Sequence, residues 1–418
     1  MIAEIISTGD EVLTGTVVDA NAAWIAGRLY ETGIAVGRHV CVGDDMERLT
    51  DVLAETGQRA DIAVVTGGLG PTVDDITASA AARAAGVELE RNKEAMACME
   101  AFFKRFDRPV SDSDAKQALL PRGASPLLNS VGTAPGFTLK IGNCRFFFLP
   151  GVPFEMRQMM ADHVIASLEA DAARNGTGSF YREKRLSLFG LPEAHVNERL
   201  ADLTGSLDGV KLGMLAEFPV IHVKLAASGT DCSALDSAVS AAADRVRERV
   251  GDYVFSETGQ SMEEVVGELL ARQSATLALA ESCTGGMIAS RITNVAGSSR
   301  YFLCSVVTYS NDAKMRMLGV PAHTLETFGA VSEHTAREMA EGARRMADAD
   351  YAVSVTGIAG PGGGTADKPV GTVCIGLCGP DRSFARQYKF PFENRMANKR
   401  IFAETALNIL RKTLISQL

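Results

Sequence analysis

Short apolar runs alternate with longer amphipathic stretches in the first and last parts of the chain. In the first part, this pattern predicts strands at 2–7, 36–42, 61–66 and 144–149 and helices at 21–31, 46–56 and 74–85. In the last part, it predicts strands at 276–280, 302–309, 351–356, 371–379 and 383–390 and helices at 262–272, 287–294, 312–318, 333–347 and 394–415. Strands and helices in turn are typical of α/β domains built on a parallel sheet.

The segment between these two parts has a different pattern. Strands are predicted at 182–189 and 221–226 and helices at 192–200 and 234–250, but no glycine cluster accompanies them. We therefore expect three domains, at residues 1–172, 173–257 and 258–418. The outer two are expected to be doubly wound α/β domains with parallel or mixed sheets, each with a site of its own, and the middle one a small α+β spacer.

Composition excludes several classes of protein. The chain has 418 residues, of which 46% are hydrophobic, and a formal net charge of -9, which argues against a basic nucleic-acid binder. Its eight cysteines include no Cys-x-x-Cys pair, which excludes zinc ribbons and secreted disulfide frameworks. It shows no signal-peptide pattern and no apolar run near the ~20 residues of a membrane helix. We expect a cytoplasmic homodimer that acts on small molecules and binds neither nucleic acid nor membranes.

Glycines gather where predicted strands of the last domain end, which is where ligands bind in parallel α/β folds. Glu281-Ser-Cys-Thr-Gly-Gly286 follows one strand, and Gly357 with Gly360-Pro-Gly-Gly-Gly364 follows another. Backbone N–H groups in such turns bind anions, so we expect an oxyanion or a phosphate to lie against them. The candidate binding residues are Thr284, Gly285, Gly286, Thr356, Gly357, Gly360 and Gly362.

Ser282, Tyr309 and Lys314 form a candidate catalytic set near these turns. A serine hydroxyl needs a base to become a nucleophile, and no histidine lies in these segments. A lysine with a lowered pKa or a tyrosinate would have to serve instead. On residue types alone, a helix cap, a strand side chain and a solvated lysine are the simpler interpretation. Cys283 is a second candidate nucleophile beside a helix start, although core packing explains it more simply.

The first domain has a glycine turn of its own between a buried strand and a predicted helix, Thr66-Gly-Gly-Leu-Gly-Pro-Thr-Val-Asp-Asp75. Its N–H and hydroxyl groups are suited to a phosphate. The candidate phosphate-binding residues are Gly67, Gly68, Gly70 and Thr72. Asp74 and Asp75 would repel that phosphate unless a divalent cation bridges them, so we expect a metal site there. The alternative is that both acids only form the first turn of an ordinary helix.

Five ordered segments of the last domain carry a family resemblance. They are Ala280-Glu-Ser-Cys-Thr-Gly-Gly286, Thr308-Tyr-Ser-Asn-Asp-Ala-Lys314, Gly329-Ala-Val-Ser332, Val355-Thr-Gly-Ile-Ala-Gly-Pro361 and Lys368-Pro-Val-Gly-Thr372. Together they closely resemble the carboxy-terminal domain of the CinA family. The resemblance implies a nicotinamide-nucleotide amidohydrolase, which converts nicotinamide mononucleotide (NMN) to nicotinate mononucleotide and ammonia without a cofactor. The family's serine, tyrosine and lysine fall on Ser282, Tyr309 and Lys314.

The first domain has a matching set of segments. They are Gly9-Asp-Glu11, Asp19-Ala-Asn21, the turn from Gly67 to Thr77, Gly132-Thr-Ala-Pro-Gly136 and Leu149-Pro-Gly-Val-Pro-Phe-Glu-Met156. They resemble the CinA amino-terminal domain, which implies a molybdopterin-binding-like fold and an ADP-ribose pyrophosphatase that uses Mg²⁺, Co²⁺ or Mn²⁺. The middle segment resembles the family's KH-like domain but lacks a Gly-x-x-Gly loop, so no RNA binding is expected. The alternative is a pterin- or nucleotide-binding protein with one or both sites inactive.

Overall fold

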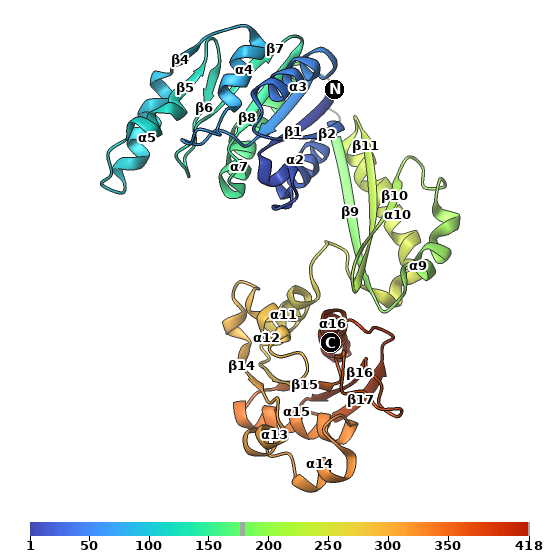
Figure 1. Cartoon of the computed structure of the whole chain (residues 1–418). Coiled ribbons are helices and arrows are strands. Elements are labelled where there is room, and N and C mark those ends of the chain that lie inside the picture. The colour runs from blue at the N-terminus through green and yellow to red at the C-terminus, as the bar shows by residue number, and fades with distance from the viewer. Residues whose placement is uncertain (176–179, 417–418) are drawn as a thin grey trace. The chain divides into compact units, whose positions relative to one another are not determined.

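A six-stranded mixed sheet forms the centre of the first part of the chain in the computed structural model, which describes residues 1–175 and 180–416 (Figure 1). The strand order is β2-β1-β3-β8-β7-β6, with the first four strands parallel and β7 antiparallel to both of its neighbours. The bounds are β1 (Ile2–Thr8), β2 (Ala35–Val42), β3 (Ile62–Thr66), β6 (Ser125–Leu127), β7 (Gly136–Ile141) and β8 (Cys144–Leu149). The four strands predicted from the sequence are the parallel ones, so that prediction is confirmed.

Helices cover both faces of this sheet. One face packs against α2 (Ala20–Glu31), α7 (Pro153–Met159), the π-helical η2 (Met160–Ile165) and α8 (Ala166–Asn175), and the other against α3 (Met46–Arg59), α4 (Thr77–Ala85) and α5 (Lys93–Lys104). The remaining elements are α1 (Asp10–Leu13), β4 (Leu89–Arg91), α6 (Asp112–Ala115), η1 (Lys116–Ala118) and β5 (Leu119–Pro121). The helix predicted to begin at Asp74 begins at Thr77 instead, because the Asp75 carboxylate closes a turn onto the Thr72 N–H.

The middle segment forms a four-stranded sheet of order β10-β11-β9-β12. Its elements are β9 (Phe180–Phe189), α9 (Glu193–Leu200), η3 (Ala201–Leu203), β10 (Lys211–Glu217), β11 (Val220–Gly229), α10 (Cys232–Val250), η4 (Gly251–Tyr253) and β12 (Val254–Ser256). Both predicted strands and both predicted helices are present. β10 was not predicted, and its residues are largely exposed in the structure.

A five-stranded sheet of order β14-β13-β15-β16-β17 forms the last part of the chain. β13 (Leu277–Glu281) runs parallel to β14 (Phe302–Val307) and β15 (Tyr351–Gly357), whereas β16 (Thr372–Cys378) and β17 (Ser383–Lys389) complete it in antiparallel pairs. α11 (Met262–Arg272), α12 (Met287–Thr293) and α16 (Arg395–Ile415) lie on one side, and α13 (Asn311–Leu318), α14 (Ala322–Phe328) and α15 (Glu333–Ala347) on the other (Figure 1). A short 3-10 helix, η5 (Ser298–Arg300), precedes β14. The mixed α/β fold expected for this domain is confirmed.

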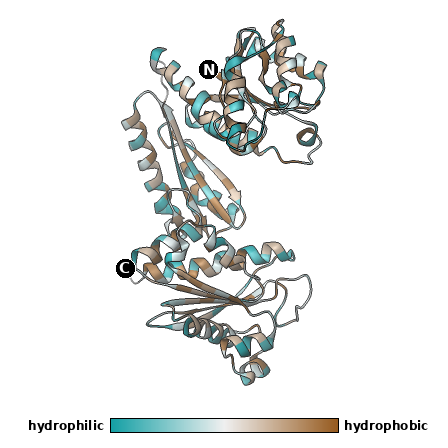
Figure 2. Ribbon diagram, turned by 90° about the vertical axis from the view of Figure 1, so that its left-hand side faces the viewer, coloured by the Kyte–Doolittle hydropathy of each residue, from teal (hydrophilic) through white to brown (hydrophobic). Residues whose placement is uncertain are grey.

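Contacts divide the chain into two compact units, Met1–Arg182 with Ala227–Ser237 and Glu183–Ala226 with Ala238–Leu418. Hydrophobic residues concentrate in the central strands of the sheets, whereas the helices present polar residues as well (Figure 2). Among the described helices, none combines the length and the apolar character needed to cross a bilayer. The buried parallel strands bring their carboxyl ends, and the glycine turns that follow them, to one edge of each α/β sheet.

Candidate functional site

The side chains of Ser282 and Lys314 meet at the carboxyl end of β13. Ser282 follows β13 directly, and its backbone N–H donates to the Val355 carbonyl of β15 at 2.9 Å. Lys314 lies on α13, and its Nζ is 3.1 Å from Ser282 Oγ and 2.8 Å from the Thr308 carbonyl oxygen, to which it donates. The parallel pairing of β14, β13 and β15 thus brings two of the three predicted catalytic residues into hydrogen-bond contact.

Lys314 is among the most deeply buried charged side chains, with only 1% of its surface exposed. Burial lowers the pKa of Lys314, because an ammonium group loses its hydration there. A neutral amine at this position is able to accept the proton of the Ser282 hydroxyl. The pair therefore has the geometry of a nucleophile with an adjacent base.

Glu281 holds the turn that carries Ser282. Its carboxylate is fully buried and accepts hydrogen bonds from the backbone N–H groups of Ile288 (3.2 Å) and Ala289 (2.9 Å) in the first turn of α12. The positive end of that short helix is therefore matched by a side chain of the protein rather than by a ligand. This role was not predicted, although an acid at the end of a buried strand was an available signal.

Three residues of the glycine turn, Thr284, Gly285 and Gly286, were predicted to bind an anion, and the N–H group of one of them is already used within the turn. The Gly285 N–H donates to the Ser282 carbonyl at 3.1 Å, so it closes the turn and is not free to bind an oxyanion. No described residue accepts from the N–H groups of Thr284 or Gly286 on either side of it. Gly286 has a φ of +88°, a conformation that favours glycine over other residues. Thr284 and Gly286 are thus the better candidates for oxyanion donors in this turn.

Tyr309 is placed apart from the Ser282–Lys314 pair. β14 ends at Val307, not at Tyr309 as predicted, because Ser310 caps α13 and leaves Tyr309 in the connecting loop. Its side chain is 63% exposed, and its hydroxyl accepts a hydrogen bond from Arg395 Nη2 at 2.9 Å. In the described structure that hydroxyl makes no hydrogen bond to Ser282 or Lys314.

Two cationic side chains of α16 lie beside the glycine turns, and neither was predicted. Arg395 Nη1 donates to the Gly360 carbonyl at 2.7 Å, so its guanidinium links the glycine-rich segment to Tyr309. The Nζ of Lys399 lies 3.6 Å from the position that a Cβ on Gly285 would occupy. These two residues place positive charge at the edge of the site, where it could bind an anionic group of a substrate.

The remaining predicted binding residues lie at the end of β15. The Thr356 hydroxyl is buried and donates to the Ala330 carbonyl at 2.8 Å, so it holds a neighbouring loop. A Cβ on Gly357 would lie 2.7 Å from the Thr372 carbonyl oxygen, which explains the glycine by close packing. Gly360 has a φ of +85°, and Gly362 has open space around it in the exposed stretch that follows.

Cys283 is buried and belongs to the hydrophobic core of the domain. Burial raises the pKa of its thiol to about 12, so the thiolate form is negligible near neutral pH. The interpretation of Cys283 as a packing residue is therefore favoured. Cys374 is buried as well, and burial raises its pKa to about 12.

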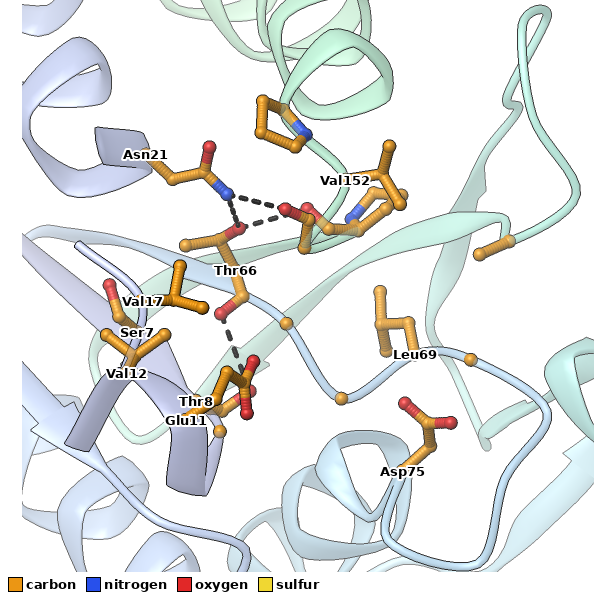
Figure 3. A pocket seen from close by; sticks show the side chains of 18 of the residues that line it. Ser7, Thr8, Glu11, Val12, Val17, Asn21, Thr66, Leu69, Asp75 and Val152 are labelled. Atoms are coloured by element: carbon orange, nitrogen blue, oxygen red, sulfur yellow. Dashed lines mark hydrogen bonds between the residues drawn. The ribbon is translucent and has the colours of Figure 1, made fainter. Parts of the chain in front are cut away.

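A polar cavity of about 450 Å³ opens at the carboxyl ends of β1, β3 and β8 in the first domain (Figure 3). Thr66 Oγ1 donates to the Pro150 carbonyl at 2.9 Å, and Asn21 Nδ2 donates to the Gly151 carbonyl at 2.8 Å, so the loop after β8 is bonded to β3 and to α2. The polar and charged residues that line it are Ser7, Thr8, Glu11, Asp19, Asn21, Asp44, Thr66, Asp74, Asp75, Gln117, Thr133 and Glu155.

The predicted phosphate turn forms one wall of this cavity. A Cβ on Gly67 would lie 2.4 Å from the Thr8 carbonyl oxygen, so the turn approaches β1 too closely for any other residue. Lys116 donates to the carbonyls of Thr72 and Asp75, the latter at 3.0 Å. Its ammonium was not among the predicted groups, and it supplies positive charge beside a turn that otherwise carries acids.

The two acids of this turn differ in their surroundings. Asp75 accepts a hydrogen bond from the Thr72 N–H at 2.8 Å and another from the Thr72 hydroxyl, so its carboxylate closes the turn. Asp74 is exposed, and a hydrogen bond with Thr72 is the main cause that lowers its pKa. Burial is the main cause that raises the pKa of Asp44, and the charge of Asp74 adds to that effect. Among the described residues, no three His, Cys, Asp or Glu side chains are close enough together for a preformed metal site. Because the Asp75 carboxylate closes the turn and Asp74 is exposed, Asp74 is the better candidate of the two for a cation ligand.

Glu155 is a further acid of the cavity that was not predicted. It is 9% exposed, and Asn129 Nδ2 donates to its Oε2 at 2.6 Å. Burial raises the pKa of Glu155, and the hydrogen bond from Asn129 only partly opposes that effect. A carboxyl group with a raised pKa on the wall of a polar cavity is a candidate for proton transfer.

Comparison with protein families places three matches along the chain. Residues 4–170 match a family described as "Probable molybdopterin binding domain", residues 183–256 match "Damage-inducible protein CinA KH domain", and residues 259–414 match "CinA C-terminal domain". The Ser282–Lys314 pair lies in the last of these segments and the polar cavity in the first.

Full-length relatives are similar along the whole chain. A CinA-like protein of Desulfosudis oleivorans is 48% identical over 99% of this chain and 100% of its own length, and a CinA-like protein of Geobacter sp. is 47% identical over 100% of this chain and 98% of its own. A crystal structure described as competence/damage inducible protein CihA from Agrobacterium tumefaciens is 40% identical, covers 37% of this chain and 97% of its own, and has a TM-score of 0.35.

Proposed function

The chain belongs to the CinA family, and from that premise we propose that its carboxy-terminal domain hydrolyses the carboxamide of NMN to give nicotinate mononucleotide and ammonia. The observation that carries the proposal is the 3.1 Å contact between Lys314 Nζ and Ser282 Oγ, with Lys314 buried and its pKa lowered. An amide is cleaved readily by an activated serine, and this pair supplies both the nucleophile and its base.

The reaction follows from these positions. Neutral Lys314 takes the hydroxyl proton while Ser282 Oγ bonds to the carboxamide carbon, and the N–H groups of Thr284 and Gly286 stabilise the negative oxygen that develops. The lysine proton then passes to the leaving nitrogen, and ammonia departs as the ester to Ser282 forms. Water attacks that ester with Lys314 again as base, which releases the carboxylate product and restores the serine.

Positive charge at the edge of the site supports a nucleotide as substrate. NMN carries a phosphate monoester on its ribose, and Arg395 and Lys399 lie beside the turns at Gly360 and Gly285. Arginine binds phosphate oxygens in a bidentate manner, and lysine adds a point charge. We assign Tyr309 to this binding group rather than to the base, because its hydroxyl contacts Arg395 and not Lys314.

The test is ammonia release from NMN by the full-length chain, its Ser282→Ala variant and its Lys314→Ala variant. Turnover by the wild type and its loss in both variants, with unchanged thermal melts, would support the proposal. If the wild type released no ammonia from NMN but did release it from another nucleotide amide, NMN would be excluded as the substrate. Equal turnover by the wild type and Ser282→Ala would exclude this serine as nucleophile.

For the amino-terminal domain we propose cleavage of a nucleoside diphosphate, with ADP-ribose as the substrate that the resemblance favours. The observation that favours it is a glycine turn in the wall of a 450 Å³ cavity whose charged lining residues are acids, a set that suits a phosphate bound together with a cation, and the Lys116 ammonium donates to carbonyls of the same turn. A divalent cation would be held by Asp74 together with substrate oxygens and would neutralise phosphate charge. Glu155, with its raised pKa, is the proposed proton donor or acceptor.

Release of AMP from ADP-ribose, measured with Mg²⁺, Co²⁺ or Mn²⁺, tests this activity, whereas pterin binding without turnover would support the alternative.

A further inference from the structure

A second, larger cavity lies in the unit that contains the carboxy-terminal domain, and it shares no residue with the Ser282 site. Its volume is about 910 Å³, near the upper end of the range for small-molecule sites. β17 and α16 form one side of the cavity, and residues 189–193, 216 and 218–221 line the other. Nothing in the proposed deamidation uses this cavity.

The side of the cavity formed by β17 and α16 follows from the periodicity of these two elements. On β17, Phe384, Arg386 and Tyr388 alternate along the strand and so share one face. The opposite face of β17 contacts α15, since Ser383 Oγ donates to Glu341 and the Gln387 N–H donates to Glu333. On α16, the lining residues recur at helical spacing and form one stripe: Ile401, Thr405, Asn408, Ile409, Lys412, Thr413 and Ser416.

Aromatic side chains make up much of the apolar wall. Phe218 and Phe392 meet edge to face with ring centroids 5.0 Å apart, and Tyr388 and Phe390 stack 6.3 Å apart. Phe218 is 41% exposed, so a large hydrophobic side chain faces open space at the cavity. Partly exposed aromatic side chains around a cavity of this size favour an apolar body as the occupant.

The charged residues of the lining are unbalanced. They comprise three cations, Arg382, Arg386 and Lys412, and a single acid, Glu193. Arg382 is held by Thr413 and Ser416, to which its Nη2 donates at 3.2 and 3.4 Å, and it lies over the Phe384 ring. Arg386 lies 5.7 Å from the same ring centroid on the exposed side of the strand. Positive charge at the rim of an apolar cavity complements an anion with a hydrophobic body.

We propose that this cavity binds a small amphipathic anion, with its apolar body among the aromatic rings and its carboxylate or phosphate between Arg386 and Lys412. The apolar lining gives affinity through burial, and the two cations select an anionic head over a neutral one. A neutral compound of the same shape would bind more weakly. The site is separate from the proposed deamidase chemistry, so neither proposal depends on the other.

The test uses the full-length chain and the fluorescent anion 8-anilinonaphthalene-1-sulfonate, without any nucleotide. We expect saturable binding of one probe at this cavity, displacement by decanoate, and weaker displacement by decanol. Arg386→Gln should lower the affinity for decanoate by about fivefold, which is the effect of losing a partly exposed ion pair. It should leave the affinity for decanol unchanged. Arg345→Gln, which removes an exposed arginine of α15 outside the cavity, is the matched control and should change neither.

A second variant tests the place of binding. Ile409→Trp adds bulk to the α16 stripe and should abolish probe binding, while the thermal melt reports whether the chain still folds. Equal binding of decanoate and decanol, or no effect of Arg386→Gln and Ile409→Trp, would overturn the proposal. A change from dimer to monomer in Ile409→Trp, measured by light scattering, would show instead that a second copy of the chain occupies this face.

Discussion

The guanidinium of Arg395 donates a hydrogen bond to the Tyr309 hydroxyl at 2.9 Å, across 86 residues of sequence. Tyr309 is therefore oriented by a cation of α16 and not by the amine of Lys314, although Lys314 follows it closely in the chain. The sequence pattern groups Ser282, Tyr309 and Lys314 as one catalytic set, whereas the structure separates Tyr309 from the other two. In the proposed reaction, Ser282 and Lys314 would cleave the bond, and Tyr309 and Arg395 would hold the substrate.

Replacement of Ser282 by alanine is expected to lower the turnover of NMN at least about a thousandfold, because it removes the atom that attacks the carboxamide. Cys283→Ala is the matched control, since it changes the adjacent residue by a similar volume. It should retain most of the turnover because the thiol is buried and has a pKa raised to about 12. Ammonia release by the two variants, with melts to check folding, decides between them. An inactive Cys283→Ala beside an active Ser282→Ala would assign the nucleophile to sulfur.

The pH dependence of turnover should report the lowered pKa of Lys314. The neutral amine is the active form, so kcat/KM for NMN should fall as the pH drops through that pKa and level off above it. A profile that is flat where Lys314 changes its protonation state would contradict its role as base. Lys314→Arg should be inactive across the profile, because a guanidinium stays protonated and gives no neutral base.

The stability of the fold should depend on the same group. Because the Lys314 pKa is lower in the folded state, the unfolded chain binds more protons between the folded and the ordinary lysine pKa. The free energy of unfolding should therefore rise with pH in that window. The stability gained there should be lost again as the pH falls toward the folded pKa. Lys314→Met should remove this part of the slope, so its melting temperature relative to wild type should decrease as the pH rises. Parallel curves for the two proteins would argue against a lowered pKa.

Tyr309→Phe and Arg395→Gln should act mainly on substrate binding. Arg395→Gln removes a cation and its bond to the Gly360 carbonyl, so KM for NMN should rise about tenfold, the scale of one charge-assisted hydrogen bond. Tyr309→Phe removes only a hydroxyl and should change KM less, with kcat within a few-fold of wild type in both. Steady-state kinetics separate the two effects. A large loss of kcat with unchanged KM in Tyr309→Phe would instead place the phenol in the chemical step.

Removal of divalent cations should separate the two proposed activities. A chelator should abolish ADP-ribose cleavage and leave NMN deamidation intact in the same preparation, because Ser282 and Lys314 need no metal for the proposed steps. Asp74→Asn should raise the Mg²⁺ or Co²⁺ concentration required for half-maximal activity at least about tenfold. Loss of a residue that only supports a metal ligand already lowers metal affinity by about that factor. Asp75→Asn should act through the turn that it closes on Thr72, so added metal should not restore its activity.

The sequence predicts the buried parallel strands well and the contacts between distant side chains poorly. β3 and β13 are short, largely apolar runs followed by glycine turns, and this combination of length and flanking residues is typical of a buried strand. The meeting of Ser282 with Lys314 follows from parallel pairing of predicted strands. The contact of Arg395 with Tyr309 depends on where α16 starts over the sheet, which no local pattern contains. Lys116 and Glu155 are likewise single polar residues whose positions are set by tertiary packing.

The contact between Glu281 and α12 also bears on how this domain could acquire a different substrate. One carboxylate joins the end of a strand to the start of a helix, so the turn with Ser282 is held at both ends. Exchanges there would disturb the nucleophile itself, whereas the exposed segment that includes Gly362 lies outside this constraint. Divergence in specificity is therefore expected to accumulate around residues 360–364 and 395–399, while residues 281–286 stay invariant among relatives that keep the chemistry.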